Sequence, residues 1–282
     1  VIVDKPQGWT SQDVTARLRR VFGTRRIGHG GTLDPMATGV LPVFVGRATR
    51  AVEFFEHAEK TYETVLRLGI TTDTEDMTGT VLTEENVSFT EEQLQETLAA
   101  FRGEILQVPP MYSALKVNGQ KLCDLARKGK TVERQPRPIT IHELTLVERG
   151  ENTLRLRVRC SKGTYIRTLC KDIGEHLGCG GCMESLRRVA AGEYAIDEAV
   201  PLQTLLDTEE PEKYLRDVDT MFRNYPAVTL TANQETRCRN GNAFSVSLAP
   251  GTYRAYSQGG EFLMLAKVDG GVMSTIKSFF QV

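Results

Sequence analysis

The sequence predicts an α+β fold, in which a mixed, largely antiparallel sheet is flanked by helices and followed by a small β-rich C-terminal domain. Two segments, 60–69 and 153–160, alternate apolar and polar residues with the period of two that half-buried strands show. Other segments repeat apolar residues at helical spacing between a capping residue and a glycine. After Tyr225 the chain changes to short strand-like runs separated by glycine pairs.

Strand-like residues 1–4 open the chain, and two capped helices are expected further along. In the segment 10–23, Thr10 or Ser11 is the N-cap and Gly23 ends the helix. In the segment 90–103, Thr90 and Gln93 form a capping box, and a stripe of Leu94, Leu98 and Phe101 faces the core. Both segments therefore read as helices that pack on a sheet.

The two alternating segments are the most regular strands of the sequence. The segment 60–69 places Tyr62 on its inward face together with Thr64 and Leu66. The segment 153–160 has one apolar face and one face made entirely of arginines. Such one-sided strands are typical of antiparallel or mixed sheets.

The second half of the chain contains further predicted helices, followed by the short strand-like runs. The segment 161–178 predicts a turn into a helix, with Tyr165 and Arg167 in the first turn and Gly178 just after the end. The segment 201–222 reads as helical and acidic. We therefore expect a domain boundary near Phe222, which separates a larger domain at 1–222 from a smaller one at 223–282.

Charge is distributed unevenly along the chain, although the formal net charge is only −1. Residues 84–104 carry six acidic side chains against one basic, whereas residues 116–137 carry seven basic against two acidic. Further basic patches lie at 17–20 and at Arg25 and Arg26. Such patches either follow a nucleic acid backbone or are ordinary solvated surface, and charge alone does not separate these readings.

Hydropathy and cysteine content narrow the class of protein. No run of about 18 apolar residues suggests a membrane span, and no charged-then-apolar leader is seen, so a cytoplasmic protein without membrane contact is expected. Cys179 and Cys182 form the one CxxC pair. A zinc site would need a second pair or histidines at ligand spacing, so we interpret these as buried thiols and expect no metal.

The stretch IGHGGTLDPMATGVLPVFVG, residues 27–46, surrounds Asp34 with five glycines and His29. An Asp-Pro pair is by itself a common turn starter. Gly28, Gly30 and Gly31, however, allow another part of the chain to approach closely. The pattern therefore indicates a functional loop.

This stretch resembles the catalytic signature of the TruB family of tRNA pseudouridine-55 synthases. Other blocks resemble that family in the same order and spacing, so the resemblance covers residues 1 to about 200. They are DKPQGWTSQDV from Asp4, KTYETVLRLGITTDTEDMTG from Lys60, QVPPMYSALKVNGQKLCDLARKGK from Gln107, CSKGTYIRTLCKDIGEHLGCG from Cys160 and SLRRVAAG from Ser185.

The resemblance implies isomerisation of one uridine in the T loop of tRNA, without a metal or organic cofactor. Asp34 matches the family's essential acid, which either attacks ribose C1′ or takes the 2′ proton. Arg167 matches the arginine that pairs with this acid and keeps it ionised. Tyr62 matches a tyrosine that stacks on the flipped uracil and helps to remove the C5 proton.

The resemblance also implies how the RNA is bound. Tyr165 would hold the nucleotide, Leu186 would shape the pocket wall, and His29 would fill the stacking gap left by the flipped base. Lys5 would support the substrate pocket. A basic insertion at about 107–137 would fold over the RNA, and 223–282 would form a small PUA-like RNA-binding domain. The insertion residues expected to contact RNA are Lys116, Arg127, Lys128 and Lys130.

Three other functions would fit parts of the same sequence. A tRNA-binding or tRNA-folding module would need the basic insertion and His29 but not Asp34 with Arg167. A guide-RNA-dependent synthase of the dyskerin kind shares the core but usually has longer basic tails. A nucleosidase would use a similar carboxylate without the insertion. The favoured partner is the T arm of tRNA, bound by a monomer.

Overall fold

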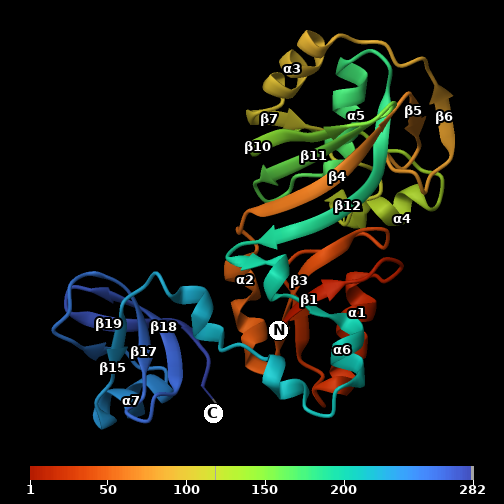
Figure 1. The fold of residues 1–282 in the computed structure, drawn as a ribbon. Helices are drawn as coiled ribbons and strands as arrows, with labels where there is room; N and C mark the ends of the chain where they lie inside the picture. Colours follow the sequence, from red (N-terminus) through yellow and green to blue (C-terminus); the bar gives the residue numbers. More distant parts are fainter. Residues whose placement is uncertain (118, 281–282) are drawn as a thin grey trace.

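A computed structural model describes residues 1–117 and 119–280. Figure 1 shows a tall body built from the first 220 or so residues and a smaller lobe, drawn in blue, at its lower left. The predicted insertion includes residue 118 and the predicted C-terminal domain includes 281–282, and these three positions lie outside the described residues. Among the described residues, no helix is long and apolar enough to cross a membrane.

The body is organised by one ten-stranded sheet that runs from its base to its top (Figure 1). Pairing is parallel at β1·β14 and β3·β12, and antiparallel in the other described strand pairs of this sheet. The predicted mixed, largely antiparallel sheet is therefore confirmed. The strand order is β14 (Val200–Pro201), β1 (Ile2–Lys5), β3 (Thr38–Val45), β12 (Gly181–Ala191), β4 (Lys60–Leu68), β11 (Thr153–Cys160), β10 (Arg137–Arg149) and β7 (Gly103–Gln107), with β13 (Tyr194–Ala195) on β12 and β2 (Ile27–His29) on β3.

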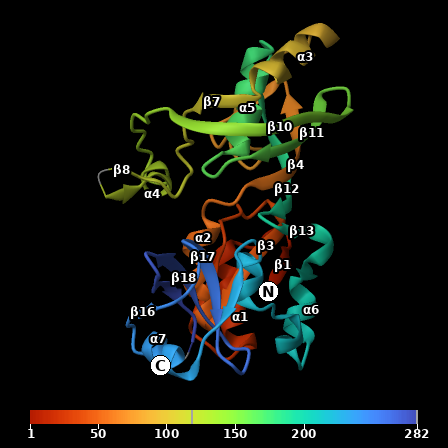
Figure 2. The same ribbon diagram turned by 90° about the vertical axis from the view of Figure 1, so that its left-hand side faces the viewer.

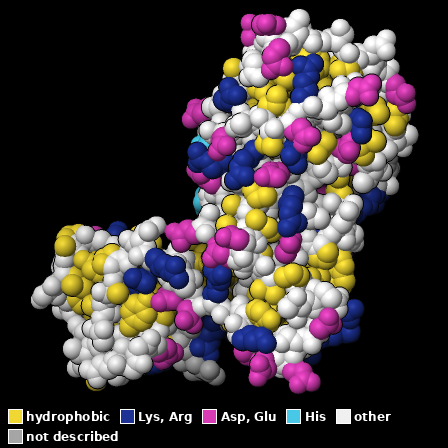
Figure 3. Space-filling view, in the orientation of Figure 1, with side chains coloured by type: hydrophobic (Ala, Val, Ile, Leu, Met, Phe, Trp, Pro, Cys, Tyr) yellow, Lys and Arg dark blue, Asp and Glu magenta, His cyan; other side chains and the backbone are white. Residues whose placement is uncertain are grey.

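The alternation predicted for β4 and β11 is present. Tyr62 and Leu66 of β4 are buried, as are Leu156 and Val158 of β11. The outward arginines of β11 do not form a bare cationic face, because glutamates pair with them. The pairs are Arg155 with Glu148 at 2.9 Å, Arg157 with Glu63 at 3.1 Å and Arg159 with Glu59 at 2.8 Å. Figure 3 shows basic and acidic side chains interleaved on the body.

Helices cover the sheet in two groups. α3 (Glu91–Ala100) and α5 (Ile166–His176) pack on the upper half, and α1 (Ser11–Val21) and α6 (Leu202–Asp207) pack on the lower half (Figure 1). Thr10 caps α1 in a capping box with Asp13, and Thr90 caps α3 with Gln93. Each such cap stabilises its helix by about 1 kcal/mol.

The helix expected over 201–222 is shorter than predicted. α6 ends at Asp207, and the remainder forms two short 3-10 turns, η3 (Pro211–Tyr214) and η4 (Val218–Phe222). Pro211 stands at the start of η3, where its missing N–H is tolerated, but it cannot continue a helix from α6. The acidic pattern alone did not reveal this break.

Two excursions leave the sheet near the upper half. β5 (Ile70–Thr72) and β6 (Val81–Glu84) form a hairpin, and its turn lies against β12. Between β7 and β10 the chain forms β8 (Lys116–Val117), β9 (Gln120–Lys121) and α4 (Leu122–Ala126). Figure 2 shows this second excursion projecting from the body at the left.

The C-terminal lobe is a five-stranded sheet with one helix. Its strand order is β15 (Ala227–Thr229), β17 (Gly251–Tyr256), β18 (Phe262–Asp269), β19 (Val272–Ser278) and β16 (Phe244–Ser245). The helix α7 (Ala232–Arg239) was not predicted. Its N-cap Thr231 forms a capping box with Gln234, a signal present in the sequence but hidden among short strand-like runs.

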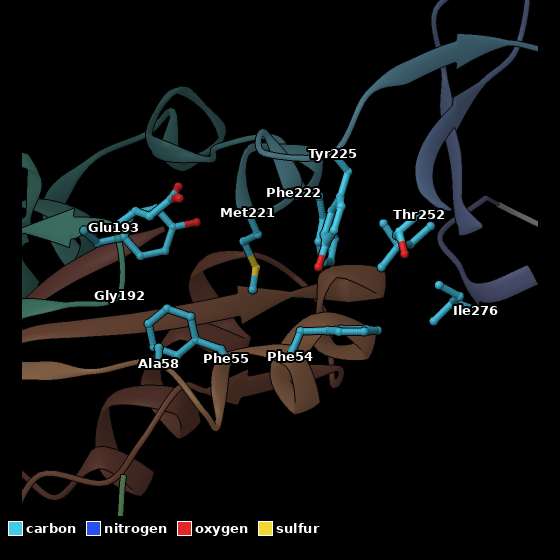
Figure 4. Close-up of a pocket in the computed structure, with 12 residues that line it drawn as sticks. Phe54, Phe55, Ala58, Gly192, Glu193, Met221, Phe222, Tyr225, Thr252 and Ile276 are labelled. Atoms are coloured by element: carbon cyan, nitrogen blue, oxygen red, sulfur yellow. The ribbon is translucent and has the colours of Figure 1, made fainter. Parts of the chain in front are cut away.

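The lobe docks on the body through aromatic rings and backbone contacts. Phe222 lies 5.8 Å from Phe279 and 6.1 Å from Phe262, measured between ring centroids. Arg50, in the turn η1 (Gly46–Ala51), donates to the Ser278 carbonyl at 2.9 Å. A cavity of about 310 Å³ lies at the junction, lined by Phe54 and Phe55 of α2 (Val52–Phe55), Met221 and Phe222 of η4, and Thr252 and Ile276 of the lobe (Figure 4).

Candidate active site

The loop between β2 and β3 carries Asp34 and is fixed from several sides. The Ser11 hydroxyl accepts from the Leu33 N–H at 2.9 Å, and the Gly8 N–H donates to the Pro35 carbonyl at 2.8 Å. The Ala37 N–H donates to the Asp34 carbonyl at 3.0 Å. The start of α1 therefore holds the backbone on both sides of the carboxylate.

The glycines of this loop allow close packing. A Cβ placed on Gly30 would lie 2.4 Å from Cδ1 of Phe55, so no other residue fits there without moving the ring. Gly39 has φ +103° and passes against the backbone of Arg188, where a Cβ would lie 2.2 Å from the carbonyl oxygen. The loop can therefore be pressed against α2 and β12 only because these positions lack side chains.

Asp34 forms an ion pair with Arg167, as the sequence predicted. Oδ2 of Asp34 lies 3.0 Å from Nε of Arg167, which projects from the first turn of α5. The Arg167 side chain is 6% exposed, whereas that of Asp34 is 38% exposed. The pair therefore has a buried cation and a carboxylate that still faces outward, an arrangement suited to reaction with a bound molecule.

Backbone carbonyls orient the Arg167 guanidinium. Nη1 donates to the Thr74 carbonyl at 3.0 Å and Nη2 donates to the Tyr112 carbonyl at 2.8 Å. Thr74 belongs to the turn between β5 and β6, and Tyr112 belongs to the excursion between β7 and β10. Both excursions thus reach the ion pair, and they leave Nε aimed at Asp34.

A second acid, Asp76, lies beside Arg167, and sequence reasoning did not single it out. Its Oδ2 is 3.7 Å from Nε of Arg167, and its Oδ1 accepts from the Thr78 N–H at 2.9 Å. The neighbouring Glu75 has φ +64°, and its carbonyl accepts from the Met183 N–H of β12 at 3.0 Å. The turn is therefore pinned to the central strand in a conformation that is uncommon for a residue with a side chain.

Tyr62 and Leu186 lie on the neighbouring strands β4 and β12, both 8% exposed. Leu186 is in register with Thr64, and Arg188 is in register with Tyr62. Burial raises the pKa of the Tyr62 hydroxyl, and the charge of Arg188 opposes this shift. The phenol is therefore neutral at physiological pH.

Tyr165 is the N-cap residue of α5 and is held by a side-chain amide. Gln107, at the end of β7, accepts from the Tyr165 N–H at 2.8 Å and donates to the Tyr165 carbonyl at 3.1 Å. Burial raises the pKa of the Tyr165 hydroxyl. This clamp fixes the backbone two residues before Arg167.

Arg188 is a further buried cation that sequence reasoning missed. The residue is 1% exposed, and its Nε donates to the Val40 carbonyl at 2.7 Å while Nη2 donates to the Gly31 carbonyl at 3.1 Å. These two carbonyls lie on opposite sides of Asp34 in the chain. No ion pair joins Arg188 to a carboxylate within the described part of the chain, so its role is to hold the loop to β12 through backbone carbonyls.

Lys5 lies behind the same loop and is fully buried. Its Nζ donates to the carbonyls of Trp9 at 2.7 Å, Pro6 at 2.9 Å and Pro35 at 3.4 Å. Burial lowers the Lys5 pKa to about 8. The side chain thus reaches the loop from the side opposite to solvent.

His29 lies at the end of β2 and is partly exposed. Its Nδ1 is buried and has no hydrogen-bond partner within the described residues. Burial lowers the His29 pKa, and the charge of Arg188 adds to that effect. The imidazole is therefore neutral near pH 7 and available as a flat ring.

The side chains of the excursion that are predicted to contact RNA lie on the protein surface. Lys116, Arg127, Lys128 and Lys130 are all exposed on β8 and around α4. Arg127 pairs with Asp124 at 3.3 Å, a contact between exposed groups that contributes little to stability. The excursion reaches the ion pair through the Tyr112 carbonyl.

The cysteines show no arrangement for chemistry. Cys179 and Cys182 are buried free thiols, and Sγ of Cys182 contacts Sδ of Met77 at 3.4 Å. Within residues 1–117 and 119–280, no group of three or more metal-ligating side chains is placed to hold an ion.

Comparison with solved structures identifies the fold. A chain of a Cbf5–Nop10–Gar1 complex superposes with a TM-score of 0.74 at 25% identity, covering 99% of this chain and 84% of the other. A chain of an H/ACA ribonucleoprotein bound to a substrate RNA containing 2′-deoxyuridine gives a TM-score of 0.73 at 22% identity, covering 100% and 84%.

Family models place the chain in one class, the pseudouridylate synthases. Residues 19–166 match the N-terminal domain of the TruB family pseudouridylate synthases, and residues 167–221 match the tRNA pseudouridylate synthase B C-terminal domain.

Similar proteins narrow the class further. A protein of Ralstonia pickettii named tRNA pseudouridine synthase B is 48% identical over 88% of this chain and 80% of its own length. Proteins of the same name from Clostridium kluyveri and Escherichia coli K12 are 42% and 39% identical, covering 93% and 95% of this chain and 92% and 90% of their own lengths. The chain therefore belongs to the TruB family, as its motifs predicted.

The role of Lys5 as a buried support of the Asp34 loop can be tested through the pH dependence of the free energy of unfolding. An unfolded lysine titrates near 10.5 and folded Lys5 near 8, so between these values the unfolded chain binds more protons. The Lys5 contribution to the free energy of unfolding therefore rises with pH across this window. We expect the difference in unfolding free energy between wild type and Lys5→Met, measured by urea titration, to grow from about pH 8 to about pH 10.

The matched substitution Lys267→Met, at an exposed site on β18, should give a constant difference over the same range. A constant difference for Lys5→Met as well would contradict the assignment of Lys5 as a buried support of the loop.

Proposed function

We propose that this protein isomerises one uridine of tRNA to pseudouridine, and that the target lies in the T loop at position 55. The observation that carries the proposal is Asp34, a partly exposed carboxylate held 3.0 Å from a buried guanidinium. Identities of 39–48% with tRNA pseudouridine synthases B support tRNA as the substrate.

The reaction moves one bond and leaves the atomic composition unchanged. The glycosidic bond from uracil N1 to ribose C1′ breaks, the base turns, and C5 is joined to C1′. The C5 proton then leaves, and N1 takes up a proton. Asp34 either attacks C1′ as a nucleophile or removes the 2′ proton, and both routes require an ionised carboxylate. Arg167 supplies the positive charge that stabilises this form.

The target base must leave its stack before Asp34 can reach C1′. Tyr62 would then stack on the uracil and help to remove the C5 proton, and Leu186 would form the wall beside it. Tyr165 would hold the nucleotide next to Arg167. His29, a neutral ring on the loop that carries Asp34, would fill the gap in the RNA stack.

Lys5 is assigned a different task. Its Nζ is bound by three backbone carbonyls and is fully buried, so it supports the Asp34 loop from behind and does not touch the base. No metal or organic cofactor enters this reaction scheme, because the carboxylate and the base supply every group that it needs.

Two further regions are assigned to RNA binding. Residues 107–137, which carry Lys116, Arg127, Lys128 and Lys130 on the surface, would fold over the RNA. Residues 223–282 would form a PUA-like domain and end the larger catalytic domain at 222. The five-stranded lobe with one helix is compatible with that assignment. We further propose that the protein acts as a monomer in the cytoplasm.

The alternative functions account for fewer of the structural features. A simple tRNA-binding module gives no reason for a buried arginine aimed at a carboxylate, and a nucleosidase gives none for the exposed basic excursion. A guide-RNA-dependent enzyme has the same fold, but identity with the chains of H/ACA ribonucleoproteins is only 22–25%. The purified protein should therefore act on a bare T-arm hairpin.

Asp34→Asn tests the catalytic assignment. The amide keeps one acceptor oxygen, so fold and RNA affinity should be preserved, but it is neither a nucleophile nor a base. We expect a loss of about three to four orders of magnitude in tritium release from hairpin RNA labelled at uracil C5.

The control is Asp207→Asn on the exposed end of α6, which should release tritium at the wild-type rate. Near-normal release from Asp34→Asn would return this residue to the role of an ordinary Asp-Pro turn.

Charge reversal tests the basic excursion. Replacing Arg127, Lys128 and Lys130 by glutamate should weaken hairpin binding and flatten its dependence on salt, because each lost phosphate contact reduces counterion release. Thermal unfolding should change little, since these side chains are exposed. Filter binding at a series of salt concentrations gives both quantities.

A matched triple reversal at Arg149, Arg155 and Lys213 changes the charge equally outside the excursion. If both triple variants have the same affinity and salt dependence, residues 107–137 do not contact RNA.

A further inference from the structure

Five arginines on and after α1 have no role in the site described above. Arg17, Arg19, Arg20, Arg25 and Arg26, here called the arginine cluster, fall within ten residues and are all exposed. None of them is joined to a carboxylate by an ion pair within the described residues, whereas Arg155, Arg157 and Arg159 of β11 all are. The cluster is thus a concentration of uncompensated positive charge in a chain whose net charge is −1.

Helix stability does not account for this cluster. Arg19 and Arg20 lie in the last turn of α1, where the helix dipole stabilises a cation. Arg17 lies earlier, and Arg25 and Arg26 follow the helix, so the dipole gives no reason for three of the five. Repulsion among them opposes folding, which makes an external partner the better explanation.

A surface groove runs from the segment before α1 to two arginines of the cluster. Gly8, Trp9, Asp13, Ala16, Arg17 and Arg20 line it, with a volume of about 440 Å³. At one end, the Gly8 N–H is bonded to the Pro35 carbonyl, and the Trp9 carbonyl accepts from Lys5. At the other end are the guanidinium groups of Arg17 and Arg20. The groove therefore starts at the segment that supports the Asp34 loop and leads along α1 to the cluster.

The position of α1 relative to α4 bears on the path that a bound RNA could take. In Figure 1, α4 and α1 both lie toward the right of the body, with α4 above α1, and Figure 2 shows α4 displaced to one side of α1. An RNA held by α4 above the loop can therefore continue downward along α1. The helix α1 itself has eleven residues and, at about 1.5 Å per residue, is about 16 Å long.

We propose that the arginine cluster and its groove form a second RNA-binding surface, which binds phosphates of the same RNA whose uridine enters the Asp34 site. This inference rests on the proposed function. Guanidinium groups fit phosphate oxygens in a bidentate manner, and Trp9 offers a stacking surface at the end of the groove nearest Asp34. With α4, the cluster would grip the RNA on both sides of the target nucleotide.

Neutralisation of the cluster tests this surface in the full-length protein. For Arg17→Gln/Arg20→Gln/Arg25→Gln, affinity for a T-arm hairpin or for a tRNA transcript should fall at least about tenfold at low salt. The slope of log affinity against log salt should decrease by about two to three, because up to three phosphate contacts are lost. The single-turnover rate at saturating RNA should stay at the wild-type value.

Two further variants make the result interpretable. Arg149→Gln/Arg155→Gln/Arg157→Gln removes the same charge from another part of the body and should bind RNA more tightly than the cluster variant. Arg17→Lys/Arg20→Lys/Arg25→Lys keeps the charge and should restore most of the salt slope but only part of the affinity. A cluster variant that binds both RNAs as the control does overturns the inference and leaves the cluster to another acidic partner, such as a protein.

Failure of the proposed function would give a different result from failure of the arginine-cluster proposal. Wild-type protein would then form no pseudouridine in either RNA, whereas the binding comparison would still report whether the arginine cluster contacts RNA.

Discussion

The ion pair between Asp34 and Arg167 is the interaction on which the rest of the structure depends. A guanidinium that is 6% exposed loses most of its hydration, and this cost is offset only if its donors are all occupied in good geometry. The Asp34 carboxylate, the carbonyls of Thr74 and Tyr112, and the nearby Asp76 provide that compensation. Three separate parts of the chain, the Asp34 loop, the turn between β5 and β6 and the excursion after β7, therefore meet at one side chain, and its position fixes theirs. Among the three charged side chains, that of Asp34 is 38% exposed, whereas those of Arg167 and Asp76 are buried.

The central sheet makes this convergence possible. β12 runs through its middle, pairs with both β3 and β4, and so joins the half that carries the Asp34 loop to the half that carries Tyr62 and α5. Arg188 of β12 holds the carbonyls of Gly31 and Val40, and Met183 of the same strand holds the turn that presents Thr74. One strand thus aligns both sides of the ion pair. The glycines at 30 and 39 serve this arrangement, because a side chain at either would collide with Phe55 or with the Arg188 backbone.

Local signals in the sequence predicted local structure well. The capping boxes at Thr90 and the alternation from Lys60 to Leu68 depend on residues close together in the chain, and both are present. The motif resemblance identified Asp34 and Arg167 as partners. Asp76 and Arg188 were missed because their importance arises from contacts across more than ninety residues, and neither stands in a distinctive local pattern. The helix after Asp207 was overpredicted because acidic composition was weighed above Pro211, and α7 was overlooked although Thr231 and Gln234 carried its signal.

The proposed role of Arg167 is to act on the reaction through Asp34. The most direct test is a double-mutant cycle that combines Asp34→Asn with Arg167→Met, measured as single-turnover pseudouridine formation in a T-arm hairpin. If the two groups act as a unit, the double variant should be about as slow as Asp34→Asn alone, so that the coupling is nearly as large as the whole effect of Arg167→Met. If the two losses multiply instead, Arg167 acts independently of the carboxylate, and the ion pair is not the basis of the site.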